Sequence, residues 1–118
     1  MLSRNTLPKN DAKLLWTNHV IRKMVFYRLS QSRIKRILRN PKRSEVGIAT
    51  GTIALMQPEP KTKKPSEVWL MYQRVGKKKR IITAWRYPGK SPVREAIPIP
   101  HDILEELESE GFSSVKNR

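Results

Sequence analysis

Regularly spaced apolar residues predict a helix near the N-terminus. Val20, Met24 and Tyr27 follow one another at intervals of four and three positions, which places them on one helical face. Thr17 or Asn18 can cap the start of this helix, because short polar side chains accept hydrogen bonds from its first free amides.

A second helix is predicted directly after the first. Its apolar residues are Ile34, Ile37 and Leu38, again at helical spacing, and Ser30 precedes them as a candidate cap. Pro41 marks the end of this helix, since the residue before a proline disfavours helical dihedral angles.

Three later segments are predicted to be extended. Residues 46–56 are rich in β-branched side chains and contain two glycines, which fits one strand bent at a glycine or two short strands with a turn near Thr50-Gly51. Residues 67–75 are the clearest strand, and their apolar residues on both faces indicate a central position in a sheet. Residues 80–87 return as the antiparallel partner after a turn.

Alternation assigns the side chains of the last two strands to faces. The first of these strands has Val68, Leu70 and Tyr72 on one face, and on the other Trp69, Met71 and Gln73. The second has Ile81, Thr83, Trp85 and Tyr87 on one face, and on the other Ile82, Ala84 and Arg86.

The order of these elements predicts an α+β fold. Two N-terminal helices would pack on one face of an antiparallel sheet of three to four strands. This domain covers residues 17–87 and follows a mobile lead-in over residues 1–16. Residues 88–118 would then form a proline-rich connector and a short acidic helix that Asp102 can cap.

The charge of the chain changes what this fold is expected to bind. The chain has 25 Lys and Arg against 10 Asp and Glu in 118 residues, and its formal net charge is +15. Such an excess attracts nucleic acid, because Lys and Arg that neutralise phosphates release counterions. An acidic membrane surface or an acidic protein could also satisfy this charge.

Several other classes of protein are disfavoured. The chain has no cysteine, which excludes disulfides and thiolate metal sites and is compatible with the cytoplasm, where we place the protein. We expect no membrane partner, because the first residues lack the apolar core of a signal peptide and no apolar run approaches the roughly 20 residues that span a bilayer. No residue cluster has metal-ligand spacing and no glycine loop fits a phosphate, so we expect no metal and no cofactor.

Short motifs in the helical region resemble a known bacterial family. These motifs are His19, Lys23-Met24, Tyr27-Arg28, Leu29-Ser30 and Pro41. A strand such as Ile81–Trp85 ends the pattern of that family. The chain thus resembles a small, uncharacterised bacterial domain family that is similar to the BrnT toxins and, more distantly, to the RelE-like ribonuclease toxins. The family carries an arginine eight residues after its histidine. In this chain Arg28 lies nine residues after His19, so it is displaced by one position.

This resemblance implies a RelE-like fold over about residues 17–87. It also implies metal-independent cleavage of RNA, whether free or on the ribosome, as part of a toxin–antitoxin system. A small acidic antitoxin would then be the neutralising partner of this chain.

Cleavage of RNA without a metal ion needs three chemical groups. A base removes the proton of the 2′-hydroxyl, a cation stabilises charge on the phosphorus oxygens, and an acid protonates the leaving oxygen. His19 is the candidate base by residue type. The candidate catalytic cations are Lys23, Arg28 and Arg86. Tyr27 or Tyr87 could act as the acid or as a stacking platform.

Two basic clusters form the candidate nucleic-acid-binding surface, one on and after the second helix and one at the last turn. Their members are Arg33, Arg36, Arg39, Lys42 and Arg43, and Lys77, Lys78, Lys79 and Arg80. Two clusters on so small a domain can line one groove, although the lysine run also fits a solvated turn. The alternative to a ribonuclease is therefore a non-catalytic nucleic-acid-binding module of the same fold. A third interpretation is a relative in fold alone that binds an acidic protein.

The acidic C-terminal helix allows two interpretations. Residues 101–118 contain five of the ten acids of the chain and two of its Lys and Arg. The helix could fold over the basic groove as an internal mimic of phosphate. It could instead be a plain C-terminal helix whose Leu104 and Leu107 close the core, and we favour this second interpretation.

Overall fold

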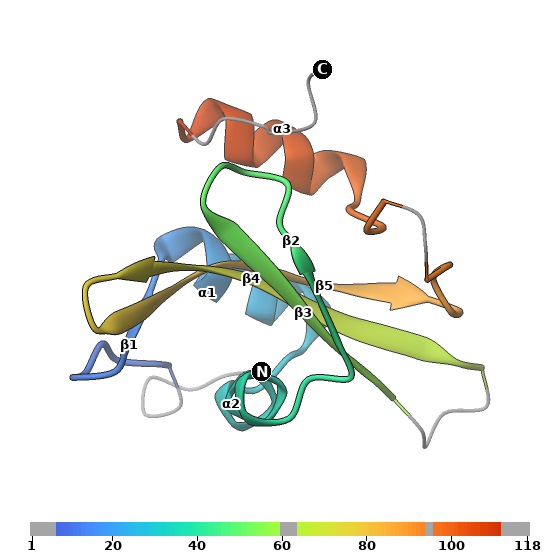
Figure 1. The fold of residues 1–118 in the computed structure, drawn as a ribbon, viewed down its shortest axis with the longest axis horizontal. Helices are drawn as coiled ribbons and strands as arrows, with labels where there is room; N and C mark the ends of the chain where they lie inside the picture. Colours follow the sequence, from blue (N-terminus) through green and yellow to red (C-terminus); the bar gives the residue numbers. More distant parts are fainter. Residues whose placement is uncertain (1–6, 60–63, 94–95, 112–118) are drawn as a thin grey trace.

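The fold is a sheet with helices on both sides. The computed structural model describes residues 7–59, 64–93 and 96–111. Its elements, in chain order, are β1 (Leu14–Trp16), α1 (Asn18–Tyr27), α2 (Gln31–Arg39), β2 (Arg43–Val46), β3 (Thr52–Pro58), β4 (Ser66–Val75), β5 (Lys78–Pro88) and α3 (His101–Ser109). Figure 1 shows the sheet between α2 and α3. The predicted α+β class is confirmed. None of the helices in the described ranges is long and apolar enough to cross a bilayer.

The sheet has five strands in the order β1-β5-β4-β3-β2. β1 runs parallel to β5, while the other neighbours are antiparallel. The prediction of three to four strands is therefore wrong in number, and its antiparallel direction holds for every pair except β1 with β5. The prediction missed β1, which pairs Trp16 with Ile81 and lies within the segment expected to be a mobile lead-in. Residues 1–6 of that lead-in lie outside the described residues.

The region predicted to be extended over residues 46–56 belongs to a hairpin of β2 and β3. The turn near Thr50-Gly51 is thus confirmed, whereas the strand before it lies almost entirely ahead of the predicted range. Gly51 has a φ of +76°, a left-handed conformation that glycine adopts without steric cost. β2 begins earlier than predicted, at Arg43, which pairs with Met56 across the hairpin.

β4 and β5 form a long hairpin that contains a β-bulge. Thr83 and Ile81 pair with consecutive residues of β4, so Ile82 between them is an extra residue in the ladder. Ile81 therefore packs in the same cluster as Ala84, while Ile82 packs in the opposite cluster with Trp85. The prediction that placed Ile81 and Trp85 on one face is wrong for this reason. The apolar faces predicted for β4 are confirmed.

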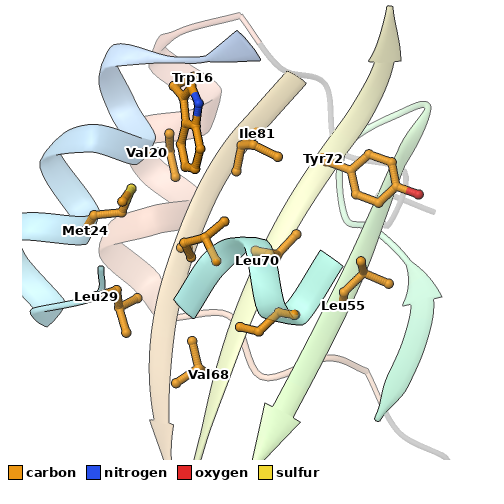
Figure 2. Packing of buried hydrophobic residues seen from close by; sticks show 12 residues of the cluster. Trp16, Val20, Met24, Leu29, Leu55, Val68, Leu70, Tyr72 and Ile81 are labelled. Atoms are coloured by element: carbon orange, nitrogen blue, oxygen red, sulfur yellow. The ribbon is translucent and has the colours of Figure 1, made fainter. Parts of the chain in front are cut away.

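Apolar side chains fill both faces of the sheet. One cluster lies between the sheet and helices α1 and α2, and it includes Val20, Leu29 and Leu70 (Figure 2). The second cluster lies beneath α3, where the Trp69 and Trp85 rings stack with their centres 5.9 Å apart. The prediction that the two N-terminal helices pack on one face is therefore confirmed, while α3 packs on the second face.

The starts of α1 and α2 follow their predicted caps, whereas the start of α3 does not. Thr17 and Ser30 each accept a hydrogen bond of 3.1 Å from a backbone amide in the first turn of their helix. α3 begins at His101 without a side-chain cap. The prediction that Asp102 caps this helix is wrong, because Asp102 lies in the first turn and its carboxylate binds Lys23.

Candidate nucleic-acid interface

A basic pocket of about 560 Å³ lies between α2, the segment before β1 and the β4–β5 turn. Ile34 and Ile37 are fully buried beneath α2, so Lys35 and Arg39 project from another face of the helix, one turn apart. The positive φ of Gly76, 63°, allows the tight turn that brings the lysines of β5 to this place. The residues that line the pocket are Asp11, Lys13, Leu14, Lys35, Leu38, Arg39, Lys77 and Lys79.

Five cations and one carboxylate line this pocket, which leaves an excess of four positive charges. The carboxylate of Asp11 accepts hydrogen bonds of 2.8 Å from the backbone amides of Lys13 and Leu14. These bonds, with the positive charges of Lys35 and Lys78, hold the pKa of Asp11 below its usual value. Within the described part of the chain, none of the five cations forms an ion pair with a carboxylate. As far as the described residues go, the pocket is therefore free to bind an anion.

The predicted basic clusters meet in part at this pocket. The predicted residues that line it are Arg39, Lys77 and Lys79. Those on the same elements, outside its lining, are Arg36, Lys78 and Arg80. Sequence reasoning did not select Lys35 or Lys13. The spacing of Lys35, one turn before Arg39, could have revealed it, whereas Lys13 is placed by the pairing of β1 with β5 and has no local signal.

Three other residues of the predicted clusters lie elsewhere. Arg33 Nη2 lies 3.2 Å from the carboxylate of Glu59. Arg43 Nη2 lies 2.9 Å from the carboxylate of Glu45. Lys42 lines another pocket, of about 500 Å³, at the opposite end of the sheet. The structure therefore does not bring all nine predicted residues to one groove.

The predicted catalytic residues His19 and Lys23 lie side by side on α1, but both are buried. Their exposed fractions are 1% and 7%. Nε2 of His19 lies 2.8 Å from Thr83 Oγ1, and Nδ1 lies 3.3 Å from Glu110 Oε2. Lys23 Nζ lies 3.0 Å from Glu106 Oε1. α3 therefore covers the pair with carboxylates and excludes a substrate from His19 while it is docked.

The ammonium of Lys23 is shared between Glu106 and Asp102, whose Oδ2 lies 3.1 Å from it. Burial alone would lower the pKa of Lys23, but the hydrogen bonds to Glu106 and Asp102 outweigh it and raise that pKa. Burial likewise opposes the charge of Asp102, yet the hydrogen bond from Lys23 lowers the pKa of Asp102. Both partners thus stay charged, and Lys23 is neutralised by α3.

The other two predicted catalytic residues lie at the far end of α1. Arg28 is nine residues from His19, which is about 13 Å along a helix, and it ends α1 in a left-handed conformation with φ 58°. Arg86 donates hydrogen bonds of 2.9 and 3.1 Å to the two carboxylate oxygens of Glu59, and another to the carbonyl of Tyr27. The structure therefore separates the four predicted catalytic residues into two places.

Glu59 forms ion pairs with both Arg86 and Arg33. Burial raises the pKa of Glu59, but hydrogen bonds from Arg86 and Ser66 and the charges of Arg86 and Arg33 outweigh it and lower that pKa below 4.5. Both arginines are thus paired with this carboxylate, which offsets one of their two positive charges. The tyrosines that could have acted as the acid, Tyr27 and Tyr87, are partly buried against the apolar clusters.

These contacts define a small α+β domain with an exposed basic pocket and a covered histidine–lysine pair. Among the residues that the structure describes, no group of three or more His, Asp and Glu side chains is placed to hold a metal ion. Comparison of the chain with protein-family models, curated proteins and solved structures finds no match. The resemblance to BrnT-like toxins, with its implied antitoxin partner, stays a prediction.

Proposed function

We propose that this domain binds RNA through the basic pocket between α2 and the β4–β5 turn. The observation that carries the proposal is the convergence of five cations from three separate chain segments, without ion-pair partners in the described residues. Unpaired cations on a surface make a phosphate-binding footprint, whereas cations already paired with carboxylates do not. The choice of RNA over DNA rests on the resemblance to the BrnT and RelE-like toxins, as does the finer proposal that the fold is RelE-like.

Charge alone sets the expected salt dependence of this binding. An excess of four positive charges neutralises about four phosphates, and each phosphate of a single strand contributes about −0.7 to the slope of log K against log salt. The wild-type slope is therefore expected near −3.

The test is to remove two pocket cations and measure affinity for a labelled single-stranded RNA. The double variant Lys35→Gln/Arg39→Gln should bind about tenfold more weakly at 100 mM salt and flatten the slope by about 1.4, because two phosphate contacts are lost. The matched control is Lys42→Gln/Lys90→Gln, which removes the same charge at the other end of the sheet. Fluorescence anisotropy over a salt series measures both quantities.

Equal losses in the two double variants would show that net charge alone attracts the RNA, and would refute the pocket. A labelled DNA oligonucleotide of the same sequence serves as a further arm. Tighter binding of the DNA than of the RNA would overturn the choice of RNA.

The second candidate function is metal-independent cleavage of RNA at His19. The observation that favours it is that the imidazole lies between a hydroxyl and a carboxylate and beside the ammonium of Lys23, which supplies a fixed base and a cation. The burial of His19 and the distance of Arg28 and Arg86 count against it. Cleavage would require α3 to leave this site.

Incubation of labelled RNA with the purified protein in EDTA tests the second candidate. We expect the RNA to stay intact, because α3 covers His19. The His19→Gln variant serves as the control, since glutamine keeps a polar group near Thr83. Cleavage by the wild type and not by this variant would instead favour the ribonuclease.

A further inference from the structure

The inner face of α3 carries a stripe of carboxylates that matches a stripe of cations on α1. Asp102, Glu106 and Glu110 follow one another at intervals of four, which puts them on one helical face. Arg22, next to Lys23 on α1, lies 3.0 Å from Glu110 through Nη2. Together with Lys23, this arginine makes the cationic stripe that α3 neutralises, and His19 lies one helical turn before both. The side chain of Arg22 is 59% exposed, so a soluble anion can reach this stripe from its edge.

Few apolar contacts hold α3 on the sheet. Its buried side chains are Ile103 and Leu107, which pack in the cluster that contains Trp69 and Trp85. The indole N–H of Trp85 is fully buried there and has no hydrogen-bond acceptor within the described residues. A buried donor without a partner weakens a contact surface. The surface beneath α3 therefore contains a buried donor without a partner among the described residues.

As a helix, α3 is also weak in isolation. It has nine residues, no side-chain cap, and no basic residue in its last turn. Glu106 and Glu108 lie near its C-terminus, and Glu110 follows directly. Negative charge at a helix C-terminus opposes the helix dipole, and a helix this short is marginal in water. The cations of α1 thus add to the burial of Ile103 and Leu107 in stabilising this acidic sequence as a docked helix.

We propose that α3 is a displaceable acidic cover over a second phosphate-binding site. The site is the stripe of His19, Arg22 and Lys23 on α1, and its ligand class is a polyanion with phosphate groups. Docking of α3 and binding of phosphates at this stripe exclude each other, because both use the same cations. The identity of the polyanion as RNA rests on the proposed function, whereas the competition itself rests on the contacts between α1 and α3.

Two double variants of the full-length chain test this competition. Glu106→Gln/Glu110→Gln removes two charges that face α1, and Glu105→Gln/Glu108→Gln removes two charges from the other side of the same helix. Both variants change the net charge equally and keep the apolar anchors of α3. The comparison therefore separates the release of α3 from a general gain in positive charge.

The first measurement is amide hydrogen exchange of α3 without any ligand. Loss of the ion pairs that face α1 should speed exchange in residues 103–109 about tenfold in Glu106→Gln/Glu110→Gln relative to the control pair. Exchange in β4 should be the same in both variants. Equal exchange of α3 in the two variants would overturn the proposal.

The second measurement is binding of inorganic polyphosphate and of a single-stranded RNA oligonucleotide. Glu106→Gln/Glu110→Gln should bind both about tenfold more tightly than the control pair at low salt, with a slope steeper by about 1.4 for two further phosphates. In the wild type, saturating polyphosphate should speed the exchange of α3. Polyphosphate that binds without changing this exchange would overturn the proposal.

The two proposals fail in different ways. If no variant binds RNA, the proposed function fails, and the polyphosphate measurement still decides whether α3 is displaceable. If the wild type binds RNA through the pocket and the two α3 variants behave alike, the proposal that α3 is displaceable is refuted. The proposal that the pocket binds RNA is then still supported.

Discussion

Replacement of Trp69 by alanine will lower the free energy of unfolding by about 3–5 kcal/mol. Trp69 is fully buried beneath α3 and stacks on Trp85, and the Arg43 guanidinium lies 5.0 Å from its ring centre. Its indole N–H donates a 3.0 Å hydrogen bond to the buried carboxylate of Glu67. The substitution therefore removes a ring stack, a cation–π contact and a donor to a buried charge. Urea unfolding followed by circular dichroism measures the loss.

The two stacked tryptophans provide a matched control. Trp69→Phe should cost about 1–2 kcal/mol more than Trp85→Phe, because both variants lose the same side-chain volume but only Trp69→Phe takes a donor from the buried Glu67. Within the described residues the N–H of Trp85 has no acceptor to lose. Equal costs for the two phenylalanine variants would contradict the hydrogen bonding described for this cluster.

Replacement of Glu59 by glutamine will lower the free energy of unfolding by about 2 kcal/mol at pH 7. The substitution leaves the guanidinium groups of Arg86 and Arg33, both partly buried, without their shared countercharge. A fully buried pair would cost more, but the Arg86 side chain is 33% exposed and water compensates part of the loss. Urea unfolding at pH 7 measures the effect. Glu105→Gln, which breaks an exposed ion pair with His101, should change stability by less than about 0.5 kcal/mol.

The same carboxylate gives stability a dependence on pH. The pKa of Glu59 is lower in the folded state than the ordinary value of 4.5, so the unfolded state binds more protons between the two values. The stability that Glu59 contributes is therefore present above pH 4.5 and is lost as the pH falls through the folded pKa. The wild type should lose more stability between pH 5 and pH 3 than Glu59→Gln does. A variant that follows the wild-type pH curve would show that Glu59 does not carry this dependence.

The parts of the fold that follow local signals were predictable from the sequence. The caps at Thr17 and Ser30, the stop at Pro41 and the turn at Gly51 act within a few residues of their elements. The pairing of β1 with β5 joins Leu14 to Lys79, and nothing near Leu14 indicates it. The bulge at β5 was hidden for a related reason, because it arises from the register of two strands and has no local signal in either.

The candidate sites were predictable to a similar extent. The helical spacing of His19 and Lys23 predicts that their side chains lie side by side, and the structure confirms this. Their burial does not follow, because it depends on α3 crossing to the far face of the sheet. Arg86 was expected to contact phosphate. Its guanidinium instead donates hydrogen bonds to the carboxylate of Glu59, which lies 27 residues earlier in the chain. Partners so distant in sequence decide which cations of a basic protein remain available.

The position of β5 in the sheet fixes the order in which this chain can fold during synthesis. Both β1 and α1 pack on β5, and Thr17 Oγ1 lies 3.0 Å from the carbonyl oxygen of Ile81. In chain order β5 is the last of the strands in this sheet, so β1 and α1 are synthesised before the strand on which they dock. Contacts this distant in sequence also slow folding, because a long loop must close first. α1 is therefore expected to become ordered after β5 has emerged, and the nascent chain carries Arg22 and Lys23 of this helix undocked until then.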